Sequence, residues 1–112
     1  MFRVIVNCGL CEPFISQCLA SLQRQTRTDW QAQVTVDRHG DATFERALAA
    51  RGSDERIVVT QNRERLFPMR NVLAAIERSA ADAEDVIIVL DGDDWLIDDR
   101  ALETIGRAYD AG

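Results

Sequence analysis

Lysine is missing from this chain of 112 residues, in which all thirteen basic side chains are arginine. Without lysine the chain has no Schiff-base amine, no lysine nucleophile and no phosphate-binding lysine of the P-loop kind. What remains is a set of permanently charged guanidinium groups, whose planar forks suit phosphate oxygens. The composition therefore excludes lysine-dependent chemistry and leaves phosphate recognition to arginine.

An excess of positive charge and long apolar runs are missing as well. The formal net charge is −6, so no basic surface is available to neutralise the phosphates of a duplex. No apolar run reaches the length of a membrane span, and the N-terminus lacks the charged and apolar regions of a signal peptide. We expect no nucleic-acid partner, no transmembrane segment and a cytoplasmic location.

Zinc ligands are scarce, because the chain has three cysteines and a single histidine. Cys8 and Cys11 have the C-x₂-C spacing of zinc or redox sites, but zinc needs further ligands, and His39 is distant in sequence. Packing thiols are the favoured interpretation of Cys8, Cys11 and Cys18. The roles of these cysteines and of His39 stay open.

The sequence alternates between short β-branched runs and segments with helical periodicity. Strands are predicted over residues 2–6, 30–36, 57–60 and 86–90, and helices follow from about residues 13, 44, 68 and 98. The third helix is expected to bury Met69, Val72, Leu73 and Ile76. The alternation predicts one α/β domain around a mainly parallel sheet, and the run at 86–90 predicts a strand buried on both faces.

Three carboxylates follow the last of these strands directly, at Asp91, Asp93 and Asp94. Like charges this close repel one another, and a hard divalent ion such as Mg²⁺ or Mn²⁺ relieves the repulsion. The alternative is a solvated acidic turn, with Asp98 and Asp99 capping the next helix. An EF-hand loop fits poorly, because apolar residues occupy three of its required positions.

Ligands of such sheets bind outside the carboxyl ends of the strands. The predicted strand ends carry amide, carboxylate and guanidinium groups, which together suit a nucleoside diphosphate. They are Asn7 and Gly9, residues 37–41, residues 62–65, and residues 91–94. A dinucleotide cofactor is disfavoured, because the turn after the first strand lacks G-x-G-x-x-G.

Four elements occur in an order that resembles a known family. They are Cys18-Leu19-Ala20-Ser21-Leu22 with Gln25-Thr26, then Asp29-Trp30 leading to Val36-Asp37, then Asn62 with Arg70-Asn71, and finally residues 90–96 with Asp91-Gly92-Asp93-Asp94. This pattern is similar to the nucleotide-sugar-binding N-terminal half of family 2 glycosyltransferases, which have the GT-A, Rossmann-like fold. D-x-D alone is a weak motif, and its place after the other three elements gives it weight.

The resemblance implies a single nucleotide-sugar-binding domain over residues 1–112, and a function as a glycosyltransferase donor domain. Asn7, Asp37, Asn62, Arg70 and Asp91 would bind a UDP-type nucleotide. Asp93, with Asp91 and Asp94, would hold Mn²⁺ or Mg²⁺, and the donor sugar would pass to a saccharide or other acceptor. The loop from Asn7 to Glu12 and the segment after Asp37 depart from the usual family pattern.

Family members continue beyond the D-x-D with a half that binds the acceptor and supplies the general base. We therefore expect this chain to be a truncated or minimal domain without its own base, so that no catalytic residue is assigned. An alternative is a non-catalytic module that binds the nucleotide or nucleotide-sugar and acts with a partner. A nucleotidyltransferase is a third, weaker possibility.

Overall fold

The computed structural model describes residues 1–37 and 40–111. Strands and helices alternate along them, as the sequence pattern predicts. In chain order the elements are β1 (Phe2–Cys8), α1 (Ile15–Gln23), β2 (Trp30–Val36), α2 (Thr43–Arg51), β3 (Ile57–Gln61), α3 (Phe67–Ser79), β4 (Val86–Asp91) and α4 (Ala101–Asp110).

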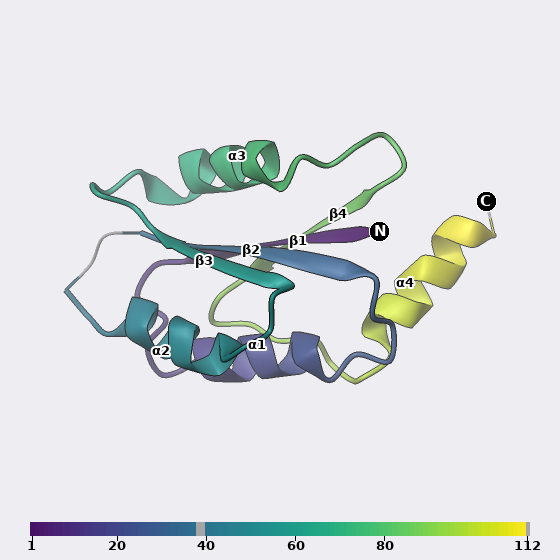
Figure 1. The fold of residues 1–112 in the computed structure, drawn as a ribbon, viewed down its shortest axis with the longest axis horizontal. Coiled ribbons are helices and arrows are strands. Elements are labelled where there is room, and N and C mark those ends of the chain that lie inside the picture. Colours follow the sequence, from purple (N-terminus) through teal and green to yellow (C-terminus); the bar gives the residue numbers. More distant parts are fainter. Residues whose placement is uncertain (38–39, 112) are drawn as a thin grey trace.

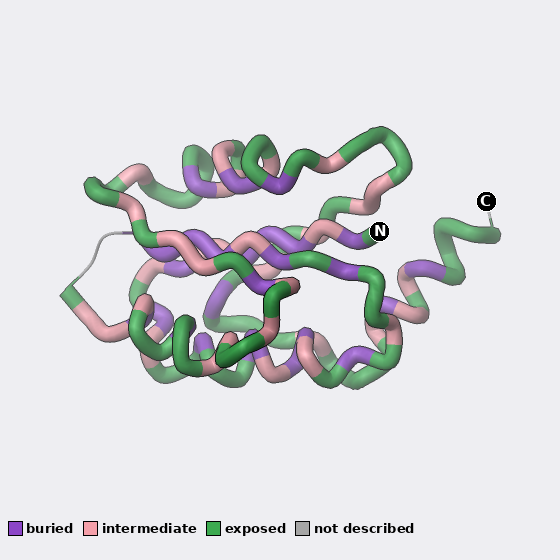
Figure 2. Tube along the Cα trace, in the orientation of Figure 1, coloured by how far each residue is buried: buried purple, intermediate pink, exposed green. Residues whose placement is uncertain are grey.

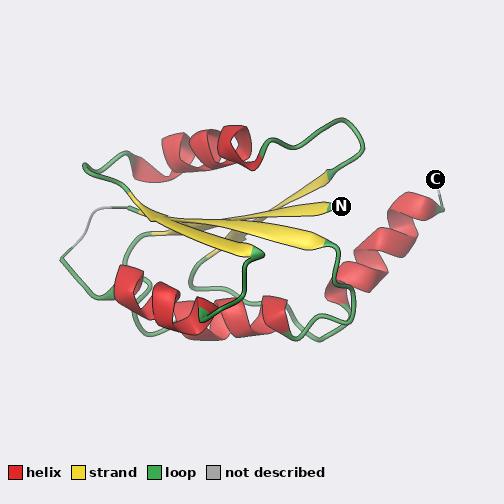
Figure 3. Cartoon of the chain, in the orientation of Figure 1, coloured by secondary structure: helices red, strands yellow, loops and turns green. Residues whose placement is uncertain are grey.

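The four strands form one sheet in the order β3-β2-β1-β4, and every pairing is parallel. Helix α3 covers one face of the sheet, and α1 and α2 cover the other (Figure 1, Figure 3). Helix α4 projects from one end of the sheet (Figure 1). The predicted fold class is therefore confirmed, and the carboxyl ends of all four strands meet at one edge.

The core lies between the sheet and helix α1 (Figure 2). In β2 the alternating residues Trp30, Ala32, Val34 and Val36 are all buried, as their period of two predicts. Helix α1 contributes a stripe of buried side chains at three- and four-residue spacing, namely Ile15, Cys18, Leu19 and Leu22. In these two elements the spacing identifies the core-facing residues, except that Phe14, which shares the helical spacing just before α1, is 41% exposed.

Strand β4 is an edge strand, and the expectation that both its faces are buried is wrong. Its residues alternate between intermediate and exposed, and Ile87 and Val89 are on the exposed face. The reason lies in its neighbours, because β4 pairs only with β1 while α3 packs over β1 and β2. One face of β4 is thus left without a covering helix among the described residues.

Helix α3 faces the sheet with small side chains, which corrects the predicted buried side. Asn71, Ala75 and Ser79 are its buried residues, whereas Met69 is 71% and Leu73 is 60% exposed. Val72 and Ile76 are intermediate. Small residues let the helix backbone approach the strands closely, so the apolar stripe lies along the flank of the helix and not beneath it.

Within residues 1–37 and 40–111, the structure has no helix that is long and apolar enough to cross a membrane.

Candidate functional site

Two neighbouring cavities open at the carboxyl edge of the sheet. The first has a volume of about 240 Å³ and reaches Asp37, and the second, of about 320 Å³, reaches Asp91 and Asp93. Both are lined by Asn7, Gly9, Leu10 and Pro68. The shared residues make the two cavities one cleft, which runs from the end of β2 across β1 to the end of β4.

The acidic end of the cleft is a tight turn at the end of β4. The Asp94 N–H donates to the Asp91 carbonyl at 2.9 Å, which folds the three carboxylates together. One oxygen from each of Asp91, Asp93 and Asp94 can be chosen so that all three lie within 4.8 Å of one another, and all three side chains are exposed. Three such oxygens on an open turn suit a hard cation that keeps water or phosphate in its other positions.

Gly92 lets this turn pack closely against the thiols of Cys8, at the end of β1, and of Cys11, in the loop that follows. A Cβ at this position would lie 2.6 Å from Cys8 Sγ and 3.1 Å from Cys11 Sγ. The Gly92 N–H also donates to the Asn7 carbonyl at 2.9 Å. Glycine is therefore needed here for close approach, and the two sulfurs form the surface on which the acidic turn lies.

The thiols beneath the turn are buried and pack against one another and against the turn. Burial raises the pKa of Cys18 to about 12, and its Sγ lies 3.9 Å from the Asp91 carbonyl oxygen. A hydrogen bond with Cys11, together with burial, raises the pKa of the Cys8 thiol well above its usual range. The same hydrogen bond lowers the pKa of Cys11. All three cysteines are free and buried, as the packing interpretation predicts.

The Asp37 carboxylate holds the start of α3. Asp37 is 3% exposed, and its oxygens accept the backbone N–H groups of Leu66 and Phe67, both at 2.9 Å. The Asn62 side chain donates to Asp37 at 3.3 Å and to Asn71 Oδ1 at 2.6 Å. This part-buried network fixes the loop between β3 and α3, and places Phe67 beside the cleft.

Asn7 lies in the middle of the cleft floor. It pairs in register with Asp91 of β4 on one side and with Thr35 of β2 on the other. Its Oδ1 is buried and has no hydrogen-bond partner among the described residues. An acceptor left unpaired in this way costs free energy, and the Asn7 residue lines both cavities of the cleft.

Two polar residues without a predicted site role, Ser21 in α1 and Gln25 just after it, hold the segment after the acidic turn. Ser21 Oγ accepts the Leu96 N–H at 3.1 Å. Gln25 donates to the Asp98 carbonyl at 2.7 Å and accepts the Leu102 N–H at 3.0 Å. The available signal was that both are polar residues one turn apart, close to the apolar face of α1.

The remaining predicted residues lie apart from the cleft or outside the described residues. Asn62 contacts Asp37 but lines neither cavity. Arg70 lines an adjoining hollow, which shares Arg65 and Phe67 with the Asp37 cavity. Asp98 accepts the Arg100 N–H at 2.9 Å in the turn before α4. The N-cap of α4 is Arg100, without a side-chain cap hydrogen bond from the described residues, so the expectation that Asp98 and Asp99 cap this helix is wrong. His39 lies outside the described residues.

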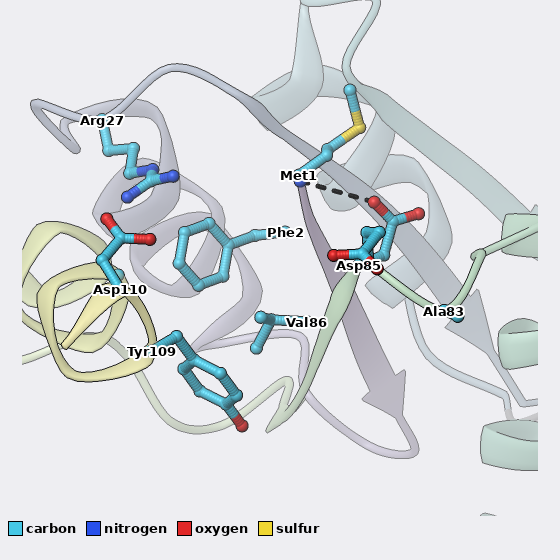
Figure 4. A pocket seen from close by; sticks show the side chains of 10 residues that line it. Met1, Phe2, Arg27, Ala83, Asp85, Val86, Tyr109 and Asp110 are labelled. Atoms are coloured by element: carbon cyan, nitrogen blue, oxygen red, sulfur yellow. Dashed lines mark ion pairs between the residues drawn. The ribbon is translucent and has the colours of Figure 1, made fainter. Parts of the chain in front are cut away.

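A further hollow of about 340 Å³ lies at the opposite edge, where β1 and β4 begin (Figure 4). Phe2, Val86 and Tyr109 line it, and the Met1 amino group pairs with Asp85 at 3.4 Å (Figure 4). Its acidic groups are already engaged in part by cations, since Arg3 also pairs with Asp85 at 3.0 Å. This hollow is separate from the cleft.

Comparison with known proteins gives a family and a fold. The family model described as "Glycosyl transferase family 2" matches residues 4–112. A crystal structure of S. aureus TarS 1-349 superposes with a TM-score of 0.83 at 23% identity, covering 98% of this chain and 32% of that one. TarS 1-349 in complex with UDP-GlcNAc gives a TM-score of 0.84 at 23% identity, covering 98% and 31%.

The TarS 1-349 complex with UDP also matches, with a TM-score of 0.83, 23% identity, and coverage of 98% and 32%. The chain thus spans about a third of the length of the solved structures that it matches. No curated protein sequence was found to match.

Proposed function

Because the chain belongs to glycosyl transferase family 2, we propose that it is a donor-binding domain for a nucleotide-diphosphate sugar of the UDP type. The observation that carries this proposal is the cleft, which joins a buried polar floor at Asn7 and Asp37 to three exposed carboxylates. A nucleoside diphosphate also has two different ends. The base and ribose are uncharged and polar, and the diphosphate is charged. The TarS structures with UDP and UDP-GlcNAc support this choice of ligand.

Asp91, Asp93 and Asp94 would hold Mn²⁺ or Mg²⁺, with Asp93 as the principal ligand. Their oxygens gather within 4.8 Å on an exposed turn, and hard oxygen donors fit either ion. When bound, the ion supplies positive charge that stabilises a diphosphate leaving group. The residues of the chain itself keep the turn rigid, since Gly92 packs on the thiols and Cys18 supports the Asp91 backbone.

The nucleoside would occupy the other end of the cleft. Asn7 offers an unpaired buried oxygen there, and Asp37 lies on the same cavity wall with its carboxylate fixed by the α3 backbone. Asn62 would act on the nucleotide through Asp37, which it contacts directly. Arg70, exposed in the first turn of α3, would approach from outside the cleft as a charge partner for phosphate.

Sugar transfer to a saccharide or other acceptor and a cytoplasmic location complete the proposal. A base must take the proton of the attacking hydroxyl on the face away from the diphosphate. The acidic triad lies at the end of the cleft assigned to the diphosphate, so these three carboxylates would serve binding and not proton removal.

Calorimetry with UDP tests this proposal. UDP should bind in Mn²⁺ and lose most of its affinity in EDTA, because the carboxylates and the diphosphate then repel one another. Asp93→Asn should lose affinity by the same order, whereas the matched control Asp110→Asn, an exposed carboxylate at the end of α4, should bind as the parent chain does. Equal UDP affinity in Mn²⁺ and in EDTA would contradict the proposed metal site.

A further inference from the structure

The loop between β3 and α3 carries an aromatic wall, formed by Arg65 and Phe67, that no role assigned above uses. The Arg65 guanidinium lies over the Phe67 ring, 4.5 Å from its centroid. Both residues line the cavity that contains Asp37 and Asn7. Phe67 nevertheless keeps 55% of its surface exposed, so its ring is available to a ligand.

The backbone conformation of Phe67 is unfavourable by itself and is held by hydrogen bonds with neighbouring residues. Phe67 has φ = 69°, a left-handed conformation that a bulky non-glycine residue adopts at a cost of about 1–3 kcal/mol. The Asp37 carboxylate accepts the N–H groups of Phe67 and of Leu66, and these bonds hold the strained residue in place. The network thus fixes where the ring stands relative to the floor of the cleft.

The cavity beside this wall combines apolar sides with a polar floor. Leu10, from the loop after β1, is largely exposed and lines the same cavity as Phe67. The floor offers the buried Asn7 Oδ1, which lacks a partner among the described residues. Flat apolar faces and a polar edge are the two properties of a nucleobase, and aromatic and arginine side chains are common stacking partners for bases.

We propose that Arg65 and Phe67 form the stacking surface for the base of the nucleotide. This inference rests on the proposed function, and it assigns the aromatic wall to the base while the acidic turn takes the diphosphate. Arg65 covers one face of the Phe67 ring. The base would stack on the other face of the ring, or on the outer plane of the guanidinium. Stacking on one base is worth about 1–3 kcal/mol, so removing the ring should weaken UDP binding roughly tenfold.

The test compares UDP with inorganic pyrophosphate, both titrated in Mn²⁺ by calorimetry. Phe67→Leu should bind UDP about tenfold more weakly and pyrophosphate unchanged, because pyrophosphate has no base to stack. Arg65→Gln, at an exposed position, should show a smaller loss of the same kind, and Phe67→Trp should restore UDP affinity. The control Phe14→Leu changes an exposed phenylalanine beside α1 and should bind both ligands normally.

Two results would separate the possible errors. If the parent chain binds UDP and Phe67→Leu binds it equally well, or loses both ligands alike, the stacking role is wrong and the donor site stands. If the parent chain binds neither UDP nor pyrophosphate in Mn²⁺, the proposed function itself is wrong. Thermal denaturation of each variant verifies that the compared chains are folded.

Discussion

At the scale of single residues, the acidic turn depends on side chains that carry no charge. Gly92 lies against two sulfurs and bonds to the Asn7 carbonyl, and Cys18 contacts the Asp91 backbone. The sequence pattern indicated the three carboxylates and the packing character of the cysteines. It could not indicate that these two features touch, because the contact joins β1 to β4 across a sequence distance of about eighty residues.

Gly92→Ala should therefore disturb the metal site without changing any ligand. The new Cβ would meet Cys8 Sγ at 2.6 Å, so the turn must move, and overpacking of this kind costs about 1–3 kcal/mol. We expect lower unfolding free energy in urea and weaker Mn²⁺-dependent UDP binding. Gly40→Ala is the control, since no atom of residues 1–37 or 40–111 lies within 4 Å of a Cβ there.

The double variant Gly92→Ala with Cys8→Ala isolates the cause of that loss. Removing the Cys8 sulfur relieves the shortest contact, so part of the UDP affinity should return. A single Gly92→Ala variant with normal stability and normal UDP binding would show that the turn does not depend on this packing.

At the scale of elements, local periodicity predicted the type and order of every strand and helix but not every orientation. In α1 and β2 the apolar residues are the buried ones, because these elements pack on the main core. In α3 the apolar stripe lies on the flank, because Asn71, Ala75 and Ser79 allow the closest approach to the strands. In β4 a continuous apolar run lies at the sheet edge, and its position depends on pairing partners that the local sequence does not contain.

The orientation of α3 gives a stability prediction. Ala75 is fully buried against the sheet, so Ala75→Leu should lower the unfolding free energy by about 1–3 kcal/mol through overpacking. Leu73→Ser, at an exposed position on the same helix, should change it by less than about 0.5 kcal/mol. Urea denaturation of the two variants measures both values. A larger loss from Leu73→Ser than from Ala75→Leu would support the buried side first predicted from periodicity.

At the scale of the whole molecule, arginine supplies the cations that hold surface carboxylates in place. Arg27 donates to Asp29 at 2.7 Å and Arg56 to Asp54 at 2.9 Å. These hydrogen bonds lower the pKa of Asp29 and Asp54 below the ordinary value of 3.8. Backbone donation from Asp82, followed by the Arg3 side chain, lowers the pKa of Asp85 in the same direction.

These shifts determine how stability changes in acid. A carboxyl whose pKa is lower in the folded state stabilises the fold above its unfolded pKa, and this contribution is lost as the pH falls through the folded value. The melting temperature should therefore be steady down to about pH 5 and fall as the pH drops past 3.8. In the double variant Asp29→Asn with Asp54→Asn, the melting temperature should fall less steeply as the pH drops, because two of the three carboxyl groups no longer titrate. A melting temperature that stays constant between pH 5 and pH 2.5 would contradict this account of the ion pairs.

The central claim is that one cleft holds the diphosphate at the acidic turn and the nucleoside toward Asp37. A crystal structure of the chain with UDP and Mn²⁺, using the anomalous signal of manganese, tests it most directly. We expect a manganese peak beside Asp93, with Asp91 or Asp94 as a further ligand, and the nucleoside against Asn7 and Phe67. Bound UDP without a manganese peak at these carboxylates, or UDP in the hollow where β1 and β4 begin, would contradict the claim.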